Sequence, residues 1–136
     1  MKGLILAAGR GSRMGALTDD RPKCMLEIGG RTLFDRQCAS LRGAGCAEIG
    51  VVRGWQGQAF DAHPVRGFDN PRWAETNMVR SLECAAEWLA AETCLVSYAD
   101  IFYPVAAAAK LAAVPGDLAV AYDRAARRFR EPGCAL

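Results

Sequence analysis

The sequence predicts an α/β protein in which helices cover both faces of a mostly parallel sheet. Short apolar runs alternate along the chain with segments of helical periodicity, which is the order expected of successive strand–helix–strand units. The length of 136 residues suits one domain or most of one. The 51% hydrophobic and 24% charged residues are those of an ordinary globular protein, which excludes wholesale disorder.

The first half of the chain predicts a strand, a long loop and a helix. Residues 2–8 form an apolar run that ends at a glycine, which indicates a strand buried on both faces. Residues 9–23 have no apolar periodicity, and loops of that length in compact domains are usually functional. Thr32 with Asp35 indicates a helix cap, after which Phe34, Cys38 and Leu41 recur at helical spacing until Gly43 and Gly45.

The second half predicts three more strands separated by helices. Residues 48–52 and 93–98 indicate strands, and a short strand is expected near 65–68 within a turn-rich segment. A helix is expected to begin at Thr76 or Asn77, with one apolar face made of Met78, Leu82, Ala85 and Leu89. Residues 105–114 predict an alanine-rich helix, stopped by Pro115 and Gly116, and residues 118–122 a further strand.

The chain is predicted to form a single domain over residues 1–136, because no repeat or linker divides it. The last segment ends without a closing element, which indicates the N-terminal part of a longer domain, so the sheet is expected to lack its C-terminal part. Its arginines at 124, 127, 128 and 130 have no interleaved aromatic residues or binding motif. A solvated helix face is therefore favoured over a nucleic-acid surface.

Charge and cysteine usage exclude several classes of protein. A formal net charge of +2 is too small to indicate nucleic acid or an acidic membrane as the main partner, and the apolar runs are too short to span a bilayer. No secretory signal is visible. The six cysteines contain no CxxC pair and His63 is the only histidine, so the sequence predicts buried thiols in a reducing cytoplasm rather than a zinc site. A reactive thiol would need a basic neighbour, and Lys23 precedes Cys24.

The long loop carries residues suited to binding phosphates. Gly9 and Gly11 allow backbone amides to approach an anion closely, while Arg13 and Lys23 supply positive charge. A Walker P-loop is excluded because no Lys-Ser or Lys-Thr follows a glycine, and a dinucleotide fingerprint is excluded because position 14 is methionine. A glycine-rich surface loop with solvated arginines is the alternative.

Two further candidate residues lie at the end of a later strand and at the start of a helix. Asp100 comes directly after a predicted strand, where a carboxylate can reach Mg²⁺, although such an aspartate can equally be a turn residue. Asn77 stands at a helix start, where it can serve simply as a cap. Trp73 and Tyr98 could face an ammonium group, but Trp73 and Trp88 are more typical of a core.

The segments LAAGRGSRMG and RPKCMLEIGG resemble the N-terminal signature of the nucleotidyltransferases that activate sugar phosphates, phosphocholine and related phosphoryl compounds. The pattern N-x-x-W-x-x-T-N-M-x-x-S-L from Asn70, followed by SYADIFY, is similar to the subgroup that makes cytidylyl derivatives of phosphocholine or 2-aminoethylphosphonate. The resemblance implies a Rossmann-like α/β/α fold, an NTP substrate, CTP for this subgroup, and a magnesium requirement. It also implies a second acidic metal ligand on a late strand, and Asp117 and Asp123 lie too early in the chain to provide it.

The resemblance also implies roles for individual residues. Arg13 and Lys23 would be catalytic, Asn77 and Ser81 would bind the second substrate, and Asp100 would bind the metal. The nucleotide would be bound by Leu6, Ala7, Ala8, Gly9, Gly11, Ser12, Arg13, Met14 and Lys23. A sugar-1-phosphate or molybdopterin-type nucleotidyltransferase, and a module that binds nucleotide without turnover, are the alternatives.

Overall fold

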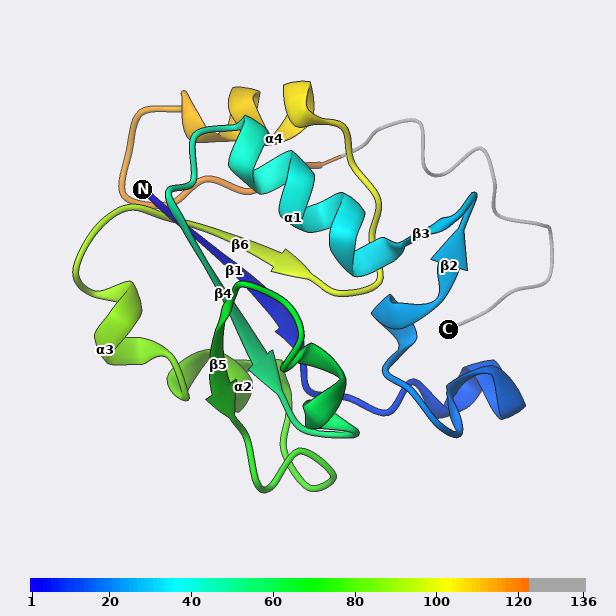
Figure 1. Cartoon of the computed structure of the whole chain (residues 1–136). Coiled ribbons are helices and arrows are strands. Elements are labelled where there is room, and N and C mark those ends of the chain that lie inside the picture. The colour runs from blue at the N-terminus through cyan, green and yellow to red at the C-terminus, as the bar shows by residue number, and fades with distance from the viewer. Residues whose placement is uncertain (123–136) are drawn as a thin grey trace, which may run out of the picture.

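Four parallel strands form the centre of the fold in the computed structural model, which describes residues 1–122 (Figure 1). The strands are β1 (Lys2–Ala7), β4 (Glu48–Arg53), β5 (Arg66–Asp69) and β6 (Cys94–Tyr98), in the order β5-β4-β1-β6. All of their pairings are parallel. These strands confirm the four predicted at 2–8, 48–52, 65–68 and 93–98, with boundaries that differ by one residue at most.

The chain adds strands first to one side of β1 and then to the other. It forms β4 and β5 on one side and then crosses over to place β6 on the opposite side, where Leu4 pairs with Val96. The carboxyl ends of β1 and β6 therefore mark the point at which the strand order reverses. Ligands of open α/β sheets bind at such a point, so the topology alone indicates where a site should lie.

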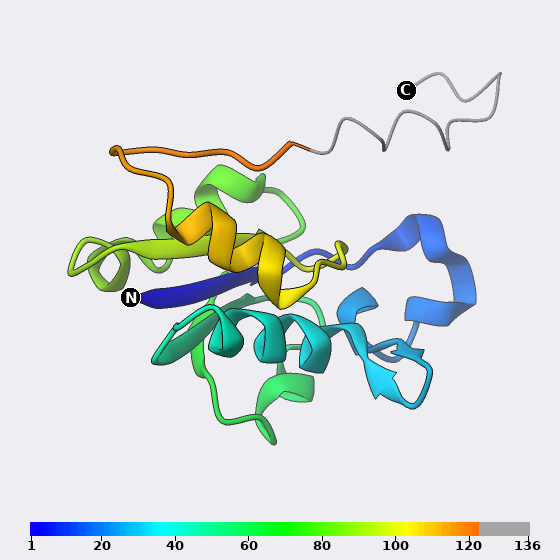
Figure 2. The ribbon, with the colours of Figure 1, turned by 90° about the horizontal axis from the view of Figure 1, so that it is seen from above.

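Helices cover both faces of the sheet and give the predicted three layers (Figures 1 and 2). α1 (Leu33–Gly43) and α4 (Val105–Ala112) lie against each other on one face, and α2 (Met78–Glu83) and α3 (Ala86–Leu89) lie on the other. The larger apolar cluster, under α1 and α4, includes Ile5, Phe34, Leu41, Val51 and Leu95. The smaller cluster, on the opposite face, is formed by Leu4, Ala8, Val52, Ala85 and Trp88.

The start and end of α1 follow from the residues predicted to set them. The Thr32 hydroxyl accepts a hydrogen bond from the backbone N–H of Asp35 at 3.0 Å, which confirms the predicted cap. α1 ends at Gly43, where a Cβ atom would lie only 2.9 Å from the side chain of Val105 at the start of α4. Glycine at this position thus allows the two helices to approach each other closely.

The helix expected from Thr76 or Asn77 to Leu89 is divided in two, which corrects the prediction. It breaks at Cys84 and Ala85 between α2 and α3. Its predicted apolar face is confirmed in part, because Ala85 is buried and Leu82 and Leu89 pack against the smaller cluster, whereas Met78 is exposed. Ser81 and Trp88 are also buried. Two contacts explain this orientation: the buried Asn70 side chain donates a hydrogen bond to Ser81, and the ring of Trp88 packs against Phe68.

The strand expected at 118–122 is not formed, so that prediction is wrong. No backbone hydrogen bond joins this segment to another part of residues 1–122, and the side chains of Leu118 and Val120 are 87% and 82% exposed. Alternating apolar residues favour a strand only where a neighbouring strand supplies the other half of the hydrogen-bond ladder.

The long loop contains structure that its sequence did not predict. It includes the 3-10 helices η1 (Ser12–Thr18) and η2 (Lys23–Met25), and a small antiparallel hairpin, β2 (Glu27–Ile28) and β3 (Arg31–Thr32), follows it. Gly29 and Gly30 both have positive φ in the hairpin turn, which glycine adopts without strain. A third 3-10 helix, η3 (Gly57–Phe60), follows β4.

Within residues 1–122, no helix is both long and apolar enough to cross a bilayer. The arginine-rich helix face predicted at 124–130, the segment to Leu136 and Cys134 lie outside the residues that the structure describes.

Candidate active site

A cavity of about 220 Å³ lies where β1 and β6 end, at the position that the topology indicates. Eight residues that the sequence assigned to the site line it: Leu6, Ala7, Gly9, Gly11, Arg13, Met14, Lys23 and Asp100. Four that it did not assign also line it: Pro22, Cys24, Tyr98 and Ala99. The structure therefore brings the residues of the long loop together with those that follow β6.

Residues 9–18, called here the glycine loop, have a backbone that depends on two glycines. Gly11 has a φ of 70°, and Gly15 has a φ of 57° with a ψ of −139°, a combination that side chains strongly disfavour. A Cβ atom on Gly11 would also lie 3.3 Å from Cβ of Lys23. The glycine loop therefore packs closely against Lys23, which carries the neighbouring positive charge.

Thr18 closes the glycine loop, and the sequence analysis missed it. Its side chain is fully buried, and its hydroxyl lies 3.2 Å from the carbonyl oxygen of Gly11 and 3.3 Å from that of Gly15. The N–H of Met14 donates a further bond to Gly11 at 2.9 Å. A lone threonine in a polar segment gives no periodic signal, so only the folded loop reveals this role.

Lys23 and Asp100 meet across the cavity, although they are far apart in the sequence. The Lys23 ammonium group lies 3.2 Å from the Asp100 carboxylate, and the two side chains are 34% and 50% exposed. Partly solvated ion pairs of this kind contribute little stability, so either charge can exchange its partner for a ligand. The Arg13 guanidinium forms no ion pair with any other described residue.

Gln37 of α1 holds the backbone on both sides of Asp100, and this contact was also missed. Its buried side-chain amide donates to the carbonyl oxygens of Tyr98 at 2.7 Å and Ile101 at 2.6 Å. The sequence did contain a signal, because Gln37 stands on the same helical face as Phe34, Cys38 and Leu41. A polar residue on an apolar face must find a buried partner.

The side chain of Asp100 is suited to be one ligand of a hard cation. Asp100 offers a half-exposed carboxylate at the cavity, and Mg²⁺ is usually bound through one or two carboxylates together with substrate phosphates. Residues 1–122 contain no group of three His, Cys, Asp or Glu side chains arranged to hold a metal. Asp100 as a metal ligand therefore stays a prediction, and the described residues add no cluster of further ligands around it.

Two of the predicted nucleotide-binding residues do not line the cavity. Ala8 is buried in the smaller apolar cluster, and its carbonyl oxygen accepts a bond from the N–H of Trp55 at 3.0 Å. Ser12 begins η1 and is exposed. Both remain close in the chain to residues that do line it, so their backbone roles stay predictions.

Asn77 and Ser81, predicted to bind the second substrate, also lie outside the residues that line the cavity. The Asn77 side chain caps α2 by accepting bonds from the N–H groups of Val79 and Arg80 at 3.1 and 3.2 Å. Ser81 is buried and accepts a bond from Asn70 at 3.1 Å. Their substrate role stays a prediction, beside the structural roles that these contacts show.

The cysteines in the described residues are free, and burial raises the pKa of four of them: Cys24, Cys38, Cys46 and Cys94. Burial raises the pKa of Cys24 to about 12 although Lys23 is its neighbour in the chain, and burial raises the pKa of Cys38 and Cys94 to about 11. Cys24 is therefore a protonated thiol at neutral pH. The hypothesis of a reactive thiol beside Lys23 has no support here.

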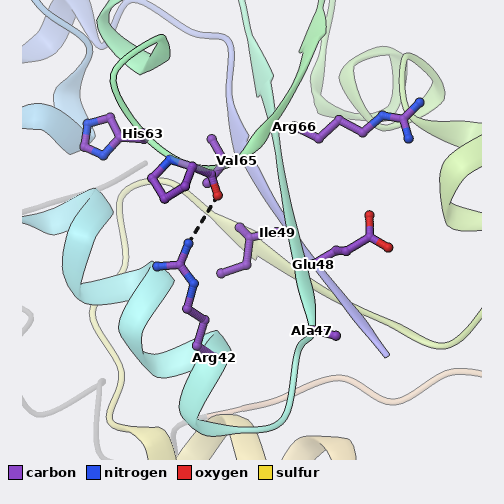
Figure 3. Close-up of a pocket in the computed structure, with 8 residues that line it drawn as sticks. Arg42, Ala47, Glu48, Ile49, His63, Val65 and Arg66 are labelled. Atoms are coloured by element: carbon purple, nitrogen blue, oxygen red, sulfur yellow. Dashed lines mark hydrogen bonds between the residues drawn. The ribbon is translucent and has the colours of Figure 1, made fainter.

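A larger hollow of about 420 Å³ lies near the amino ends of β4 and β5, away from the cavity (Figure 3). Three of its polar side chains, Arg42, His63 and Arg66, have partners of their own. The Arg42 guanidinium donates to the carbonyl oxygen of Pro64 at 3.3 Å, the His63 ring lies 3.4 Å from the Asp35 carboxylate, and the Arg66 guanidinium lies over the ring of Phe68. They do not converge on a common point, so the smaller cavity is the better candidate for chemistry.

Comparison with known protein families shows to which family the chain belongs. Residues 3–135 match the MobA-like NTP transferase domain. The chain belongs to this family. As a MobA-like NTP transferase domain it has the Rossmann-like α/β fold that the sequence resemblance implied.

Several relatives of this NTP transferase domain are cytidylyltransferases. The chain is 33% identical to the CTP:phosphoglutamine cytidylyltransferase of Campylobacter jejuni, over 97% of this chain and 58% of that protein. It is 30% identical to the CMP-5'-(3-aminopropyl)phosphonate synthase of Streptomyces rubellomurinus, over 93% of this chain and 21% of that protein. The solved CTP:phosphocholine cytidylyltransferase of Streptococcus pneumoniae superposes with a TM-score of 0.67 and 31% identity, over 73% of this chain and 44% of that one. The chain thus spans 58% or less of the length of these relatives.

Proposed function

We propose that the protein is a nucleotidyltransferase that transfers CMP from CTP to a small phosphate or phosphonate compound of the phosphocholine or 2-aminoethylphosphonate type. The observation that carries the proposal is the cavity at the ends of β1 and β6. There the glycine loop, two positively charged side chains and a carboxylate surround one space. A triphosphate needs closely approaching amides and cations, and its metal needs a carboxylate.

The proposed reaction is an in-line displacement at the α-phosphorus. A phosphate or phosphonate oxygen of the acceptor forms a new bond to the α-phosphorus, and the bond from that phosphorus to the bridging oxygen of pyrophosphate breaks. The electron pair of the broken bond leaves with pyrophosphate. The protein forms no covalent bond, so its contribution is to position the two substrates and to neutralise charge.

The residues of the glycine loop and Lys23 have roles in this proposal that follow from their charge and place. The backbone at Gly9, Gly11 and Ser12 would bind phosphate oxygens, and the Arg13 guanidinium would bind the β- and γ-phosphates. Lys23 would stabilise the charge that develops on the α-phosphate. Its ion pair with Asp100 holds the ammonium group at the cavity before the nucleotide arrives.

Asp100 is the residue that would hold Mg²⁺. The ion, when bound, neutralises the negative charge of the triphosphate and leaves fewer charges for the protein to balance. Asp100 would offer its carboxylate from a backbone that Gln37 fixes on either side. With its carboxylate engaged by a cation, Asp100 would no longer pair with Lys23, whose ammonium group could then face the α-phosphate.

The choice of cytosine and of the acceptor is supported by the names of the relatives and by the pattern around Asn77. A thermal-shift panel of CTP, UTP, GTP and ATP with Mg²⁺ distinguishes CTP from the bases used by sugar-1-phosphate and molybdopterin-type enzymes. Pyrophosphate release with phosphocholine or 2-aminoethylphosphonate as acceptor tests turnover. Nucleotide binding without pyrophosphate release would instead favour a non-catalytic module. A cytoplasmic location stays a prediction from cysteine usage.

Calorimetric titration of Mg·CTP tests the proposal at the level of the site. Replacing Arg13 by Ala should weaken binding by about tenfold, because a charge-assisted hydrogen bond to phosphate is lost. The Arg72→Ala variant is the matched control, because Arg72 is exposed and pairs only with Glu75 among the described residues. Equal affinities for the wild type and the Arg13→Ala variant would contradict the proposed triphosphate contact.

A further inference from the structure

We propose that Trp55 is a positioning residue that clamps both ends of the glycine loop and so prepares it to bind phosphate. This inference rests on the proposed function, because the loop must bind a nucleotide for its order to matter. Trp55 follows β4 and does not line the cavity. Neither the loop signature nor the predicted site residues include it.

Trp55 makes one hydrogen bond to each end of the loop. Its backbone N–H donates to the carbonyl oxygen of Ala8 at 3.0 Å, just before the loop begins. Its indole N–H donates to the carbonyl oxygen of Thr18 at 3.3 Å, where the loop ends. Trp55, just after β4, is therefore bonded to both ends of the glycine loop and holds them at a fixed separation.

The preceding residue shows how closely the backbones approach. A Cβ atom on Gly54 would lie 2.7 Å from the carbonyl oxygen of Ala8 and 2.5 Å from Cβ of Trp73. No side chain fits in that space, so glycine at 54 allows the backbone of Trp55 to reach Ala8. The ring of Trp73 then packs against that of Trp55, with centroids 5.5 Å apart.

The Trp55 ring also holds a side chain from within the loop. The Arg10 guanidinium lies 4.8 Å from the centre of the ring, a distance typical of a cation–π contact, and forms an ion pair with Asp19 at 3.2 Å. Arg10 does not line the cavity, although Gly9 and Gly11 on either side do. The ring thus holds the Arg10 side chain beside the loop and leaves the cavity to the glycines.

A glycine loop that is already ordered in the free protein should bind the nucleotide more tightly. Ordering a flexible backbone costs free energy for each residue, and glycines cost the most. A loop that is already held at both ends has less of this cost left when phosphate binds. Loss of the clamp should therefore weaken nucleotide binding without removing any group that touches the nucleotide.

The test compares the Trp55→Leu and Trp55→Phe variants by calorimetry with Mg·CTP. Trp55→Leu should weaken binding by about tenfold, because it removes the indole hydrogen bond and the aromatic contact with Arg10. Trp55→Phe keeps an aromatic face for Arg10 and should recover part of that loss. Ile49→Val, a core change near the amino end of β4, controls for general destabilisation and should leave the affinity unchanged.

Hydrogen exchange tests the clamp without any nucleotide. The backbone amides of residues 11–18 should exchange at least tenfold faster in both Trp55 variants than in the wild type, whereas those of β1 should exchange at the wild-type rate. Unchanged exchange in the loop, or an affinity of Trp55→Leu within twofold of the wild type, would overturn the inference. If the wild type binds no nucleotide but the loop amides exchange faster in the Trp55 variants, as predicted, the proposed function is contradicted and the clamp is supported.

Discussion

Lys23 is the residue whose charge the proposed reaction needs most. Replacing it by Ala should lower the rate of pyrophosphate release by about 10²–10³, the loss typical of a donor that stabilises charge in the transition state. The measurement is the steady-state rate with CTP and acceptor. Lys110→Ala removes the same charge from an exposed position on α4 and should keep the wild-type rate. A Lys23→Ala variant that is nearly as fast as this control would remove Lys23 from the mechanism.

Asp100 can be tested by a change that keeps its shape. Asp100→Asn should abolish turnover and leave the fold intact, since the amide lacks the charge that Mg²⁺ requires and the lost ion pair is partly solvated. In thermal unfolding, the wild type should gain more stability from Mg²⁺ and CTP together than from either alone. The Asp100→Asn variant should lose that synergy, and the exposed Asp117→Asn control should retain it. Synergy that persists in the Asp100→Asn variant would exclude a metal role.

Individual site residues were predictable where their chemistry was local in the sequence. Gly9, Gly11, Arg13 and Lys23 stand in one loop, residues 9–23, so their meeting at the cavity could be expected. Thr18 and Trp55 could not be found in the same way, because their partners are backbone carbonyl groups that only the folded chain places near them. The packing of the loop, rather than its composition, determines which residues hold it.

Within the glycine loop, replacing Gly15 by Ala should affect stability, whereas replacing Gly9 by Ala should affect nucleotide binding. Gly15→Ala should lower the free energy of unfolding by about 1–3 kcal/mol, because its backbone conformation is one that a Cβ atom disfavours. Gly9→Ala should cost little stability, since no atom lies within 4 Å of the added Cβ, but it should weaken nucleotide binding at the cavity. Urea unfolding and calorimetry measure the two effects. Equal stability losses for both variants would contradict this account of the loop.

The contact between α1 and the segment that carries Asp100 can be tested in the same way. Gln37→Leu leaves two carbonyl groups without their donor and should lower the free energy of unfolding by about 2 kcal/mol. Gln58→Leu changes an exposed glutamine in η3 and should cost almost nothing. The comparison uses urea unfolding of both variants. An equal stability for the two would show that Gln37 does not hold the segment.

At the level of elements, the strands of the sheet were predictable and the ends of the helical layer were not. Buried parallel strands are continuous apolar runs, and this signal depends on the sequence alone. The orientation of the segment from Met78 to Leu89 follows instead from contacts with Asn70 and Phe68, which reach it from elsewhere in the chain. The segment 118–122 shows the same limit, because an alternating pattern needs a partner strand.

For the whole molecule, the buried thiols predict how stability depends on pH. Burial raises the pKa of Cys24 to about 12 and that of Cys38 to about 11, whereas the thiols of an unfolded chain ionise near pH 8.5. Above that pH the unfolded state loses protons that the folded state keeps. The contribution of these thiols is therefore complete below about pH 8 and is lost as the pH rises toward 11 and 12.

Urea unfolding between pH 7.5 and 10.5, in steps of about half a unit, measures this effect. Each thiol that ionises only in the unfolded state should steepen the fall by at most about 1.4 kcal/mol per pH unit. The Cys24→Ala variant should show a shallower fall than the wild type, because one such group is gone. Identical slopes would mean that Cys24 ionises equally in both states.

The central claim is that a nucleoside triphosphate binds at the carboxyl ends of β1 and β6. Backbone amide chemical shifts of the 14.6 kDa chain, followed during titration with Mg·CTP, test it most directly. The account predicts that the largest shifts occur at Gly9, Gly11, Lys23 and Asp100. Shifts that instead cluster around the larger hollow, at Arg42, Ile49 and Val65, would contradict it.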